Sequence, residues 1–304
     1  FSHLTTPHIF QWLPHDLQAE RVVFLPDACP SRGPLPTGCC VQTFSPEWRR
    51  LALSDVGCGM QLLESTRCLE DFREKDWNEL GRALADLKGG LGDLGGGNHF
   101  LDAIVSYETN KLSFLIHTGS RLESGLLDEF VDRPKIFEKE YARITNWAKD
   151  NRDTIADVVR EHFGQCELVL DLPHNTFEHE SNGAVTIRKG AVKATPGALS
   201  ILPSSMTGDV VLVTATEHVG SSLLSLSHGT GRALSRGDAR NQISLAETER
   251  LRKQIYIPDY IGNSSLRTES SRCYRSLDDC LTALGPLVQQ KERFGVIAYL
   301  GHLG

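Results

Sequence analysis

The chain has 304 residues, enough for one large domain or two ordinary ones, and its 40% hydrophobic and 23% charged residues are typical of a globular protein. Its formal net charge of −7 argues against a general nucleic-acid coat protein but allows an enzyme with a local basic cleft. No run approaches the roughly eighteen apolar residues of a membrane span, and the first residues, "FSHLTTPHIF", have neither the basic region nor the apolar core of a signal peptide.

Short β-like runs dominate the sequence. They are rich in Val, Ile and Leu and are bounded by Gly, Pro or Asp, which is the pattern of strands in a sheet. They cover residues 21–26, 112–119, 166–172, 183–192, 199–205 and 209–217.

Helical patterns lie between some of these runs. Apolar residues recur at three- and four-residue steps in a first helix that Gly89 can end: Trp77, Leu80, Leu84 and Leu87. A longer helix is predicted from Pro134 to Gly164, and another over 277–294. Because strands and helices do not alternate one to one, we expect a single α+β domain over 1–304, with mixed or antiparallel sheets in the core and helices outside.

Residues 90–95, "GLGDLG", match the glycine pattern of a dinucleotide-binding loop. That loop requires a strand before it and a helix after it. Here a helix is predicted before it, and "NHFLDAIV" behind it resembles a strand. A Rossmann site is therefore not expected.

The eight cysteines are scattered and form no CxxC pair. In a chain of this length, that pattern indicates a reducing, cytoplasmic setting. A functional cysteine would then be a metal ligand or a nucleophile.

The segment "SDVGCGM" places Asp55 and Cys58 three residues apart, with glycines at 57 and 59 that let both side chains aim at one point. A carboxylate and a thiolate together suit Zn²⁺, Mn²⁺ or Co²⁺. Taken alone, the segment favours a buried cysteine in a turn that the aspartate caps.

Three further segments bring histidines to loops or strand ends. "GGGNHF" carries Asn98 and His99 behind a glycine-rich loop whose N–H groups can bind an anion. "FLIHTGSR" ends a strand at His117, and "LVLDLPHN" delivers His174, with Asp171 placed to orient a ligand histidine. A lone strand-end histidine is usually structural, but several of them together favour a metal site.

Two segments suggest phosphate chemistry. "RKGAVK" holds Arg188, Lys189 and Lys193, either a solvated edge or a grip on an RNA backbone. "SLSHGTGRALSR" sets His228 beside a flexible loop with glycines, hydroxyls and arginines. One Asp, one Cys and three histidines could hold two metals through a bridging thiolate, leaving His228 free to attack phosphorus.

These motifs, in this order, resemble the RtcB-type RNA ligases, also called tRNA-splicing ligases. The similarity runs through "LPDACPSRGPLPTG", "DVGCGM", "LGGGNHF", "HTGSR", "LPHN", "RKGA", "ILPSSM" and "HGTGR", and so through nearly the whole chain. It implies an RtcB-like fold and a cytoplasmic, GTP- and Mn²⁺-dependent ligase in RNA repair or tRNA splicing. Such an enzyme joins RNA 3′-phosphate or 2′,3′-cyclic phosphate ends to 5′-hydroxyl ends, and some relatives require a helper protein.

The resemblance also implies roles for individual residues. His228 would become guanylylated. Two Mn²⁺ ions would be held by Asp55, Cys58, His99, His117 and His174. The nucleotide would contact Asn98, Asp102, Asn175, Ser205, His228, Gly229, Thr230, Gly231 and Arg232, and the RNA phosphates would contact Arg121, Arg188 and Lys189.

The chain also departs from the family pattern, which suggests a shorter, divergent branch of bacterial type. Asp102 stands where a glutamate commonly reads guanine, Val210 where a polar residue contacts the guanylate, and Cys29 where a histidine follows Pro-Asp. The usual terminal Lys-Gly is missing, so we expect a C-terminal tail beyond this sequence. Two alternatives stay open: a metal-dependent phosphohydrolase or nucleotidyltransferase that uses the same site without joining RNA, and a degenerate RNA-binding protein.

Overall fold

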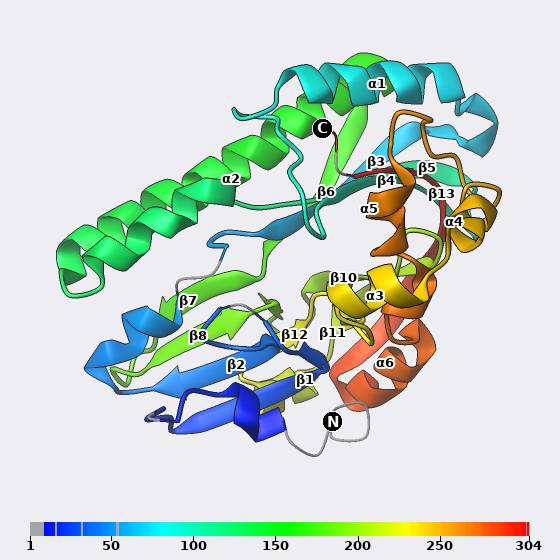
Figure 1. Cartoon of the computed structure of the whole chain (residues 1–304). Coiled ribbons are helices and arrows are strands. Elements are labelled where there is room, and N and C mark those ends of the chain that lie inside the picture. The colour runs from blue at the N-terminus through cyan, green and yellow to red at the C-terminus, as the bar shows by residue number, and fades with distance from the viewer. Residues whose placement is uncertain (1–8, 16, 32, 53–54, 302, 304) are drawn as a thin grey trace.

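The computed structural model describes residues 9–301 and 303, apart from residues 16, 32, 53 and 54. Within these residues no helix is both long and apolar enough to cross a membrane. Strands and helices build a mixed fold in which sheets form the centre and helices lie around them (Figure 1).

The largest sheet has seven strands, and every pairing in it is antiparallel. In spatial order, they are β10 (Leu199–Pro203), β11 (Asp209–Ala215), β13 (Val288–Leu300), β4 (Phe100–Ser106), β5 (Lys111–Thr118), β3 (Gly59–Cys68) and β6 (Cys166–Pro173). β5 shows why such a run forms a central strand, because every residue in it except the first is buried.

Two smaller sheets, also antiparallel, complete the β structure. One is formed by β1 (Arg21–Cys29), β2 (Thr37–Thr43), β8 (Val185–Lys189) and β7 (Asn175–His179), in that order. The other pairs β12 (Ser225–Ser227) with β9 (Ala191–Lys193). The expected α+β architecture with antiparallel sheets is therefore confirmed.

The helices follow the predicted pattern at two of three places. They are α1 (Glu74–Asp86), α2 (Pro134–Phe163), α3 (Arg236–Gln242), α4 (Leu245–Leu251), α5 (Asn263–Arg267) and α6 (Leu277–Leu284). α1 buries Trp77, Leu80 and Leu84, and α2 begins at Pro134 and ends before Gly164, which has φ +81°. In Figure 1, α1 and α2 lie together on one side of the molecule, and α3 to α6 gather on another.

Two predicted elements were wrong in extent. The expected helix over 277–294 is α6 followed by β13, because Gly285 and Pro286 end the helix and the later residues pair with β11 and β4. The expected strand over 183–192 is divided at Gly190, with φ +60°, into β8 and β9, which belong to different sheets. The segment "GLGDLG" follows helix α1 and precedes strand β4. This is the reverse of the order in a Rossmann loop, so the prediction that it is not such a loop is confirmed.

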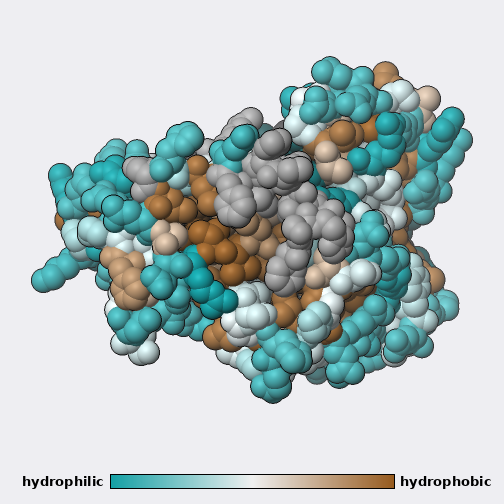
Figure 2. All heavy atoms as spheres, turned by 90° about the horizontal axis from the view of Figure 1, so that it is seen from below, coloured by the Kyte–Doolittle hydropathy of each residue, from teal (hydrophilic) through white to brown (hydrophobic). Residues whose placement is uncertain are grey.

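The main hydrophobic core packs α1 and α2 against the seven-stranded sheet, and a second cluster lies between α2 and the four-stranded sheet. Figure 2, seen from below, shows a mostly hydrophilic rim and hydrophobic side chains gathered near the middle of that face. α2 therefore contributes to both clusters and ties the two larger sheets together.

Candidate metal and nucleotide site

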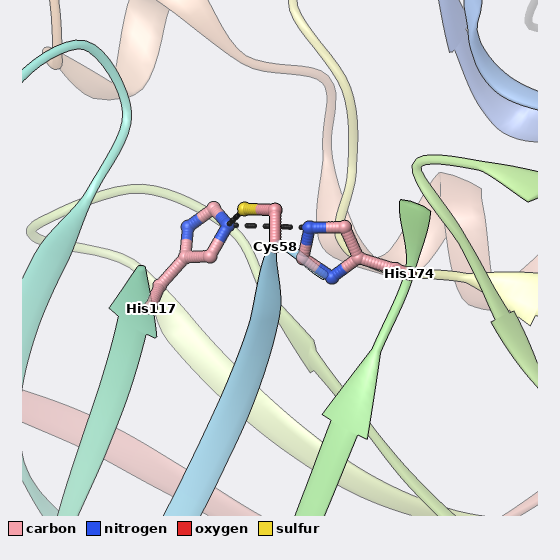
Figure 3. A group of neighbouring side chains, drawn as sticks. All are labelled: Cys58, His117 and His174. Carbon is pink, nitrogen blue, oxygen red and sulfur yellow. Dashed lines mark hydrogen bonds between the residues drawn. The ribbon is translucent and has the colours of Figure 1, made fainter. Parts of the chain in front are cut away.

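Strand register brings three of the predicted metal ligands together. Gly59 at the start of β3 pairs with Thr118 of β5 on one side and with Pro173 of β6 on the other. Cys58, His117 and His174 each lie next to one of these three residues, so their side chains meet at one end of the sheet. Figure 3 shows the three side chains pointing toward one another from these strands.

The glycines of this region permit a close approach. A Cβ on Gly59 would lie 2.8 Å from the carbonyl oxygen of Leu172, and one on Gly119 would lie 2.6 Å from Oδ1 of Asp55. The amide of His174 donates to the carbonyl of Cys58 over 2.8 Å. Any larger residue at 59 or 119 would therefore push the neighbouring ligand residues apart.

The five predicted metal ligands form one continuous cluster. Sγ of Cys58 lies 3.4 Å from Nε2 of His117 and 3.5 Å from Nε2 of His99. Nε2 of His117 is 3.4 Å from Nε2 of His174, and Nε2 of His99 is 3.1 Å from Oδ2 of Asp55. Within the described residues, two groups could hold an ion, Cys58–His117–His174 and Asp55–Cys58–His99, and they share the thiol.

The electrostatics of this cluster fit cations. Burial, then the nearby histidines, lowers the pKa of His117 and His174 well below the usual histidine range, so both imidazoles are neutral and can donate lone pairs. Burial, then the charge of Asp55, raises the pKa of the Cys58 thiol well above its usual value. A divalent cation reverses that effect on a coordinating thiol. Oδ1 of Asp55 is buried without a hydrogen-bond partner, and a cation would satisfy it.

The carboxyl group of Asp55 is already prepared as an anion. Burial alone would raise its pKa, but the hydrogen bond and charge of His99 outweigh burial and hold it at about 2. The residue adopts φ +41°, a backbone conformation uncommon for a side-chain-bearing residue. Neutral imidazoles, a thiol and a carboxylate within one shell are a donor set suited to Mn²⁺ or Zn²⁺.

His228 lies directly beside this cluster. Its ring centroid is 4.6 Å from that of His174 and 6.3 Å from that of His117. It follows β12, as the sequence predicted for a strand-end loop. Nδ1 of His228 is 2.6 Å from Oδ2 of Asp27 at the end of β1, so Nε2 is left as the nitrogen with a free lone pair.

One cavity of about 540 Å³ joins these groups. Every residue predicted to contact the nucleotide lines it: Asn98, Asp102, Asn175, Ser205, His228, Gly229, Thr230, Gly231 and Arg232. Burial raises the pKa of Asp102 well above the usual aspartate range, and its Oδ1 has no hydrogen-bond partner. A ligand that reaches Asp102 can therefore form a hydrogen bond with this buried carboxyl oxygen.

The residues predicted to contact RNA behave differently from one another. Lys189 lines the cavity, and burial lowers its pKa. Arg188 points elsewhere: its guanidinium is buried and bonds the hydroxyl of Ser225, the carbonyl of Leu223 and the carboxylate of Glu178. The side chain of Arg121 lies outside the described residues.

Three further expectations can be compared with the structure. Asp171 does not face a ligand histidine, because its carboxylate binds the guanidinium of Arg152 over 2.6 and 3.2 Å. Val210 does not face the cavity but is buried in the main core, so no polar contact is replaced there. Cys29 does line the cavity, and burial raises its pKa.

Sequence reasoning missed several residues of the site. Asp27 was part of the quoted "LPDACP" segment but received no role, although a Pro-Asp pair behind a strand was a usable signal. Glu269, Tyr274 and Tyr299 also line the cavity at the side of Asp102, and Tyr299 pairs with Asp102 across β13 and β4. The sequence offered no comparable pattern for these three residues.

Comparisons with known proteins agree with the motif order. A family model described as tRNA-splicing ligase RtcB matches residues 135–298. The chain is 29% identical over 262 residues to the tRNA-splicing ligase RtcB of Nanoarchaeum equitans. This alignment covers 62% of this chain and 54% of that protein. The chain is 27% identical over 278 residues to the RNA-splicing ligase RtcB2 of Escherichia coli, covering 75% and 73% of the two chains.

A third relative, the tRNA-splicing ligase RtcB of Thermococcus kodakarensis, is 29% identical over 264 residues, covering 62% of this chain and 54% of that protein. The chain thus spans about half the length of the archaeal relatives that it matches. Two of the clustered residues, His174 and His228, fall inside the span that the family model matches.

Proposed function

The chain belongs to the RtcB family of tRNA-splicing ligases, and we propose that it is an RNA ligase of RNA repair or tRNA splicing. It joins RNA ends that carry a 3′-phosphate or a 2′,3′-cyclic phosphate to ends that carry a 5′-hydroxyl, and it uses GTP. The whole of 1–304 acts as one catalytic domain in the cytoplasm.

One observation carries the proposal: the imidazole of His228 lies against the metal-ligand cluster and pairs with Asp27. The carboxylate of Asp27 accepts a hydrogen bond from Nδ1–H of His228, which fixes the imidazole tautomer and its direction. Nε2 of His228 attacks the α-phosphorus of GTP, the bond to the bridging oxygen breaks, and pyrophosphate leaves. The product is a phosphoramidate between His228 and GMP.

A 2′,3′-cyclic phosphate end is first opened by water, which adds to phosphorus as the bond to the 2′-oxygen breaks and leaves a 3′-phosphate. Ligation then follows in two transfers. An oxygen of the RNA 3′-phosphate attacks the phosphorus of the histidine-bound GMP, and His228 regains its lone pair. The 5′-hydroxyl of the second RNA end attacks the activated 3′-phosphate, gives up its proton, and releases GMP. Lys189, on the cavity wall, places a positive charge near these phosphates.

Two Mn²⁺ ions fit the ligand cluster. Asp55, Cys58 and His99 would hold one, and Cys58, His117 and His174 the other, with the thiolate shared. When bound, such ions neutralise phosphate charge. The chain's own contribution is to keep the imidazoles neutral by burial and to position His228 beside them.

The nucleotide occupies the cavity that all the predicted contact residues line. His228 lines the cavity beside the metal-ligand cluster, where the phosphates bind, and Asp102 and Tyr299, which pair across β4 and β13, line the same cavity. Oδ1 of Asp102 is buried and has no hydrogen-bond partner within the protein. An N–H group of a nucleotide base next to Asp102 can donate to this oxygen, and guanine carries such groups. A helper protein that promotes guanylylation is compatible with this arrangement.

Incubation with GTP labelled at the α-phosphate and Mn²⁺ tests the proposal. We expect an acid-labile, alkali-stable protein adduct in the wild type and none in His228→Ala, with mass spectrometry placing GMP on His228. His179→Ala, at an exposed histidine that pairs with Glu138 far from the cavity, serves as the control and should label normally.

The subsequent ligation step is tested separately. The labelled protein should pass GMP to an RNA with a 3′-phosphate and join it to a 5′-hydroxyl RNA. Release of phosphate from nucleotides without any adduct would contradict the ligase and indicate a phosphohydrolase.

A further inference from the structure

A second, open groove of about 440 Å³ adjoins the nucleotide cavity. Its wall is formed mainly by Gly97, Arg236, Arg240, Ser264, Ser265 and Thr268. Gly97 and Arg236 also line the nucleotide cavity, so the two spaces meet at these residues. No residue predicted from the sequence to bind metal, nucleotide or RNA lines this groove.

The groove offers only cationic and hydroxyl side chains to a ligand. Two arginines and three hydroxyl residues line it, whereas no acidic residue does. The nucleotide cavity, in contrast, includes Asp55, Asp102 and Glu269. In a chain of net charge −7, an all-cationic groove next to a phosphate-handling site is a local exception that favours an anionic ligand.

Arg236 sits where the two spaces join. Its Nε is 3.8 Å from Oε1 of the buried Glu269, which is within ion-pair distance but too long for a hydrogen bond, and this Nε has no hydrogen-bond partner. A Cβ placed on Gly97 would lie 3.9 Å from Nη2 of Arg236, in ordinary van der Waals contact, so the glycine-rich loop passes directly beside this guanidinium.

Arg240 extends this positive charge away from the cavity. It lies four residues after Arg236 on α3, so both side chains project from the same face, about 6 Å apart along the helix axis. Arg240 is exposed, and within the described residues its guanidinium has no ion-pair partner. Two like charges at this spacing repel each other, and an anion between them removes that cost.

We propose that this groove binds the sugar–phosphate backbone of the RNA whose end reacts at His228. This inference rests on the proposed ligase function and adds a binding surface to it. Arg236 and Arg240 contact phosphates one nucleotide step apart, and the hydroxyl of Ser264 donates to a phosphate oxygen. The hydroxyls of Ser265 and Thr268 already donate to the carbonyls of Gly262 and Ser265, so their oxygens accept from 2′-hydroxyl groups. Because no aromatic residue lines the groove, it follows the backbone without reading bases.

The phosphates of GTP share this chemistry, so the experiment must separate the two sources. Binding of a fluorescent single-stranded RNA with a 3′-phosphate is measured by anisotropy over a series of salt concentrations. In parallel, the GTP concentration that gives half-maximal labelling of His228 is measured. The variants are Arg240→Ala and Ser264→Glu, neither of which touches the nucleotide cavity.

We expect Arg240→Ala to raise the Kd for RNA about three- to tenfold and to reduce the salt slope by about 0.7, the value of one phosphate contact on a single strand. Ser264→Glu should weaken RNA binding at least as much, because it places a negative charge in the groove. The GTP dependence of labelling should not change. Arg250→Ala, at an exposed arginine of α4 outside the groove, is the matched control and should bind RNA as the wild type does.

Two results would overturn the proposal. An unchanged RNA Kd and salt slope in both variants would show that the groove does not hold the backbone. A raised GTP requirement in Arg240→Ala would assign the groove to the nucleotide. The RNA binding measurement does not depend on catalysis. Failure of His228 to label would therefore contradict the proposed function, whereas the RNA Kd of the variants would still test the groove.

Discussion

Oδ2 of Asp27 lies 2.6 Å from Nδ1 of His228 and 3.3 Å from its backbone nitrogen, so one carboxylate fixes both the ring and the main chain of the proposed nucleophile. The contact joins the end of β1 to the loop behind β12, elements that are 201 residues apart. Asp27 is fully buried, so water cannot replace it.

Replacing Asp27 by Asn should slow guanylylation of His228 on the order of 10²-fold, because an amide no longer selects the tautomer that leaves Nε2 free. The rate of label incorporation from GTP measures this, and the bound metal should be unchanged. Asp132→Asn, at an exposed carboxylate that pairs with Arg50, should label at the normal rate. A wild-type rate in Asp27→Asn would show that the contact does not position the nucleophile.

Cys58 is the only one of the clustered ligands that belongs to both candidate metal groups. Cys58→Ser should therefore reduce the content of both metals, whereas loss of His99 or His174 should affect one. Metal analysis after dialysis against Mn²⁺ measures this without relying on activity. Cys68→Ser, at the far end of β3, is the control. Full metal content together with full guanylylation in Cys58→Ser would refute the shared-thiolate assignment.

Much of the site followed from short motifs, because each ligand sits at a strand end or in a turn with glycines beside it. The sequence near Cys58, His117 and His174 predicted that these residues would meet, and the register of β3 with β5 and β6 brings them together. Their role as ligands stays a prediction. Local pattern was enough here because the relevant information lay within a few residues of each histidine.

Other features depend on contacts between distant segments and had no local pattern. β3 lies between β5 and the edge strand β6, yet its sequence "GMQLLESTRC" is not among the predicted strands. The first part of β13, residues 288–294, falls within the helix predicted over 277–294, whereas pairing with β11 and β4 decides its conformation. Asp171 was expected to orient a ligand histidine, but its carboxylate binds Arg152 of α2, a contact with a distant segment that no local pattern predicts.

Arg152 is the clearest case of a residue that supports the site without lining it. It is buried, forms a bidentate pair with Asp171, and donates through Nη1 to the carbonyls of Gly57 over 2.9 Å and Thr118 over 3.3 Å. These two carbonyls flank Cys58 and His117 along the chain. One guanidinium thus ties α2 to the two strand ends that carry proposed metal ligands.

Replacing Arg152 by Met should lower the free energy of unfolding by about 3–5 kcal/mol, because it leaves a buried carboxylate and two carbonyls without their donor. Urea unfolding measures this as a lower midpoint with an unchanged slope. The double variant Arg152→Met/Asp171→Leu should recover part of the loss, since no buried charge is left unpaired. Arg50→Met, which breaks an exposed pair with Glu47, should leave the urea midpoint unchanged, because water already solvates both charges. If Arg152→Met unfolded at the wild-type midpoint, the guanidinium would not be what holds these strand ends together.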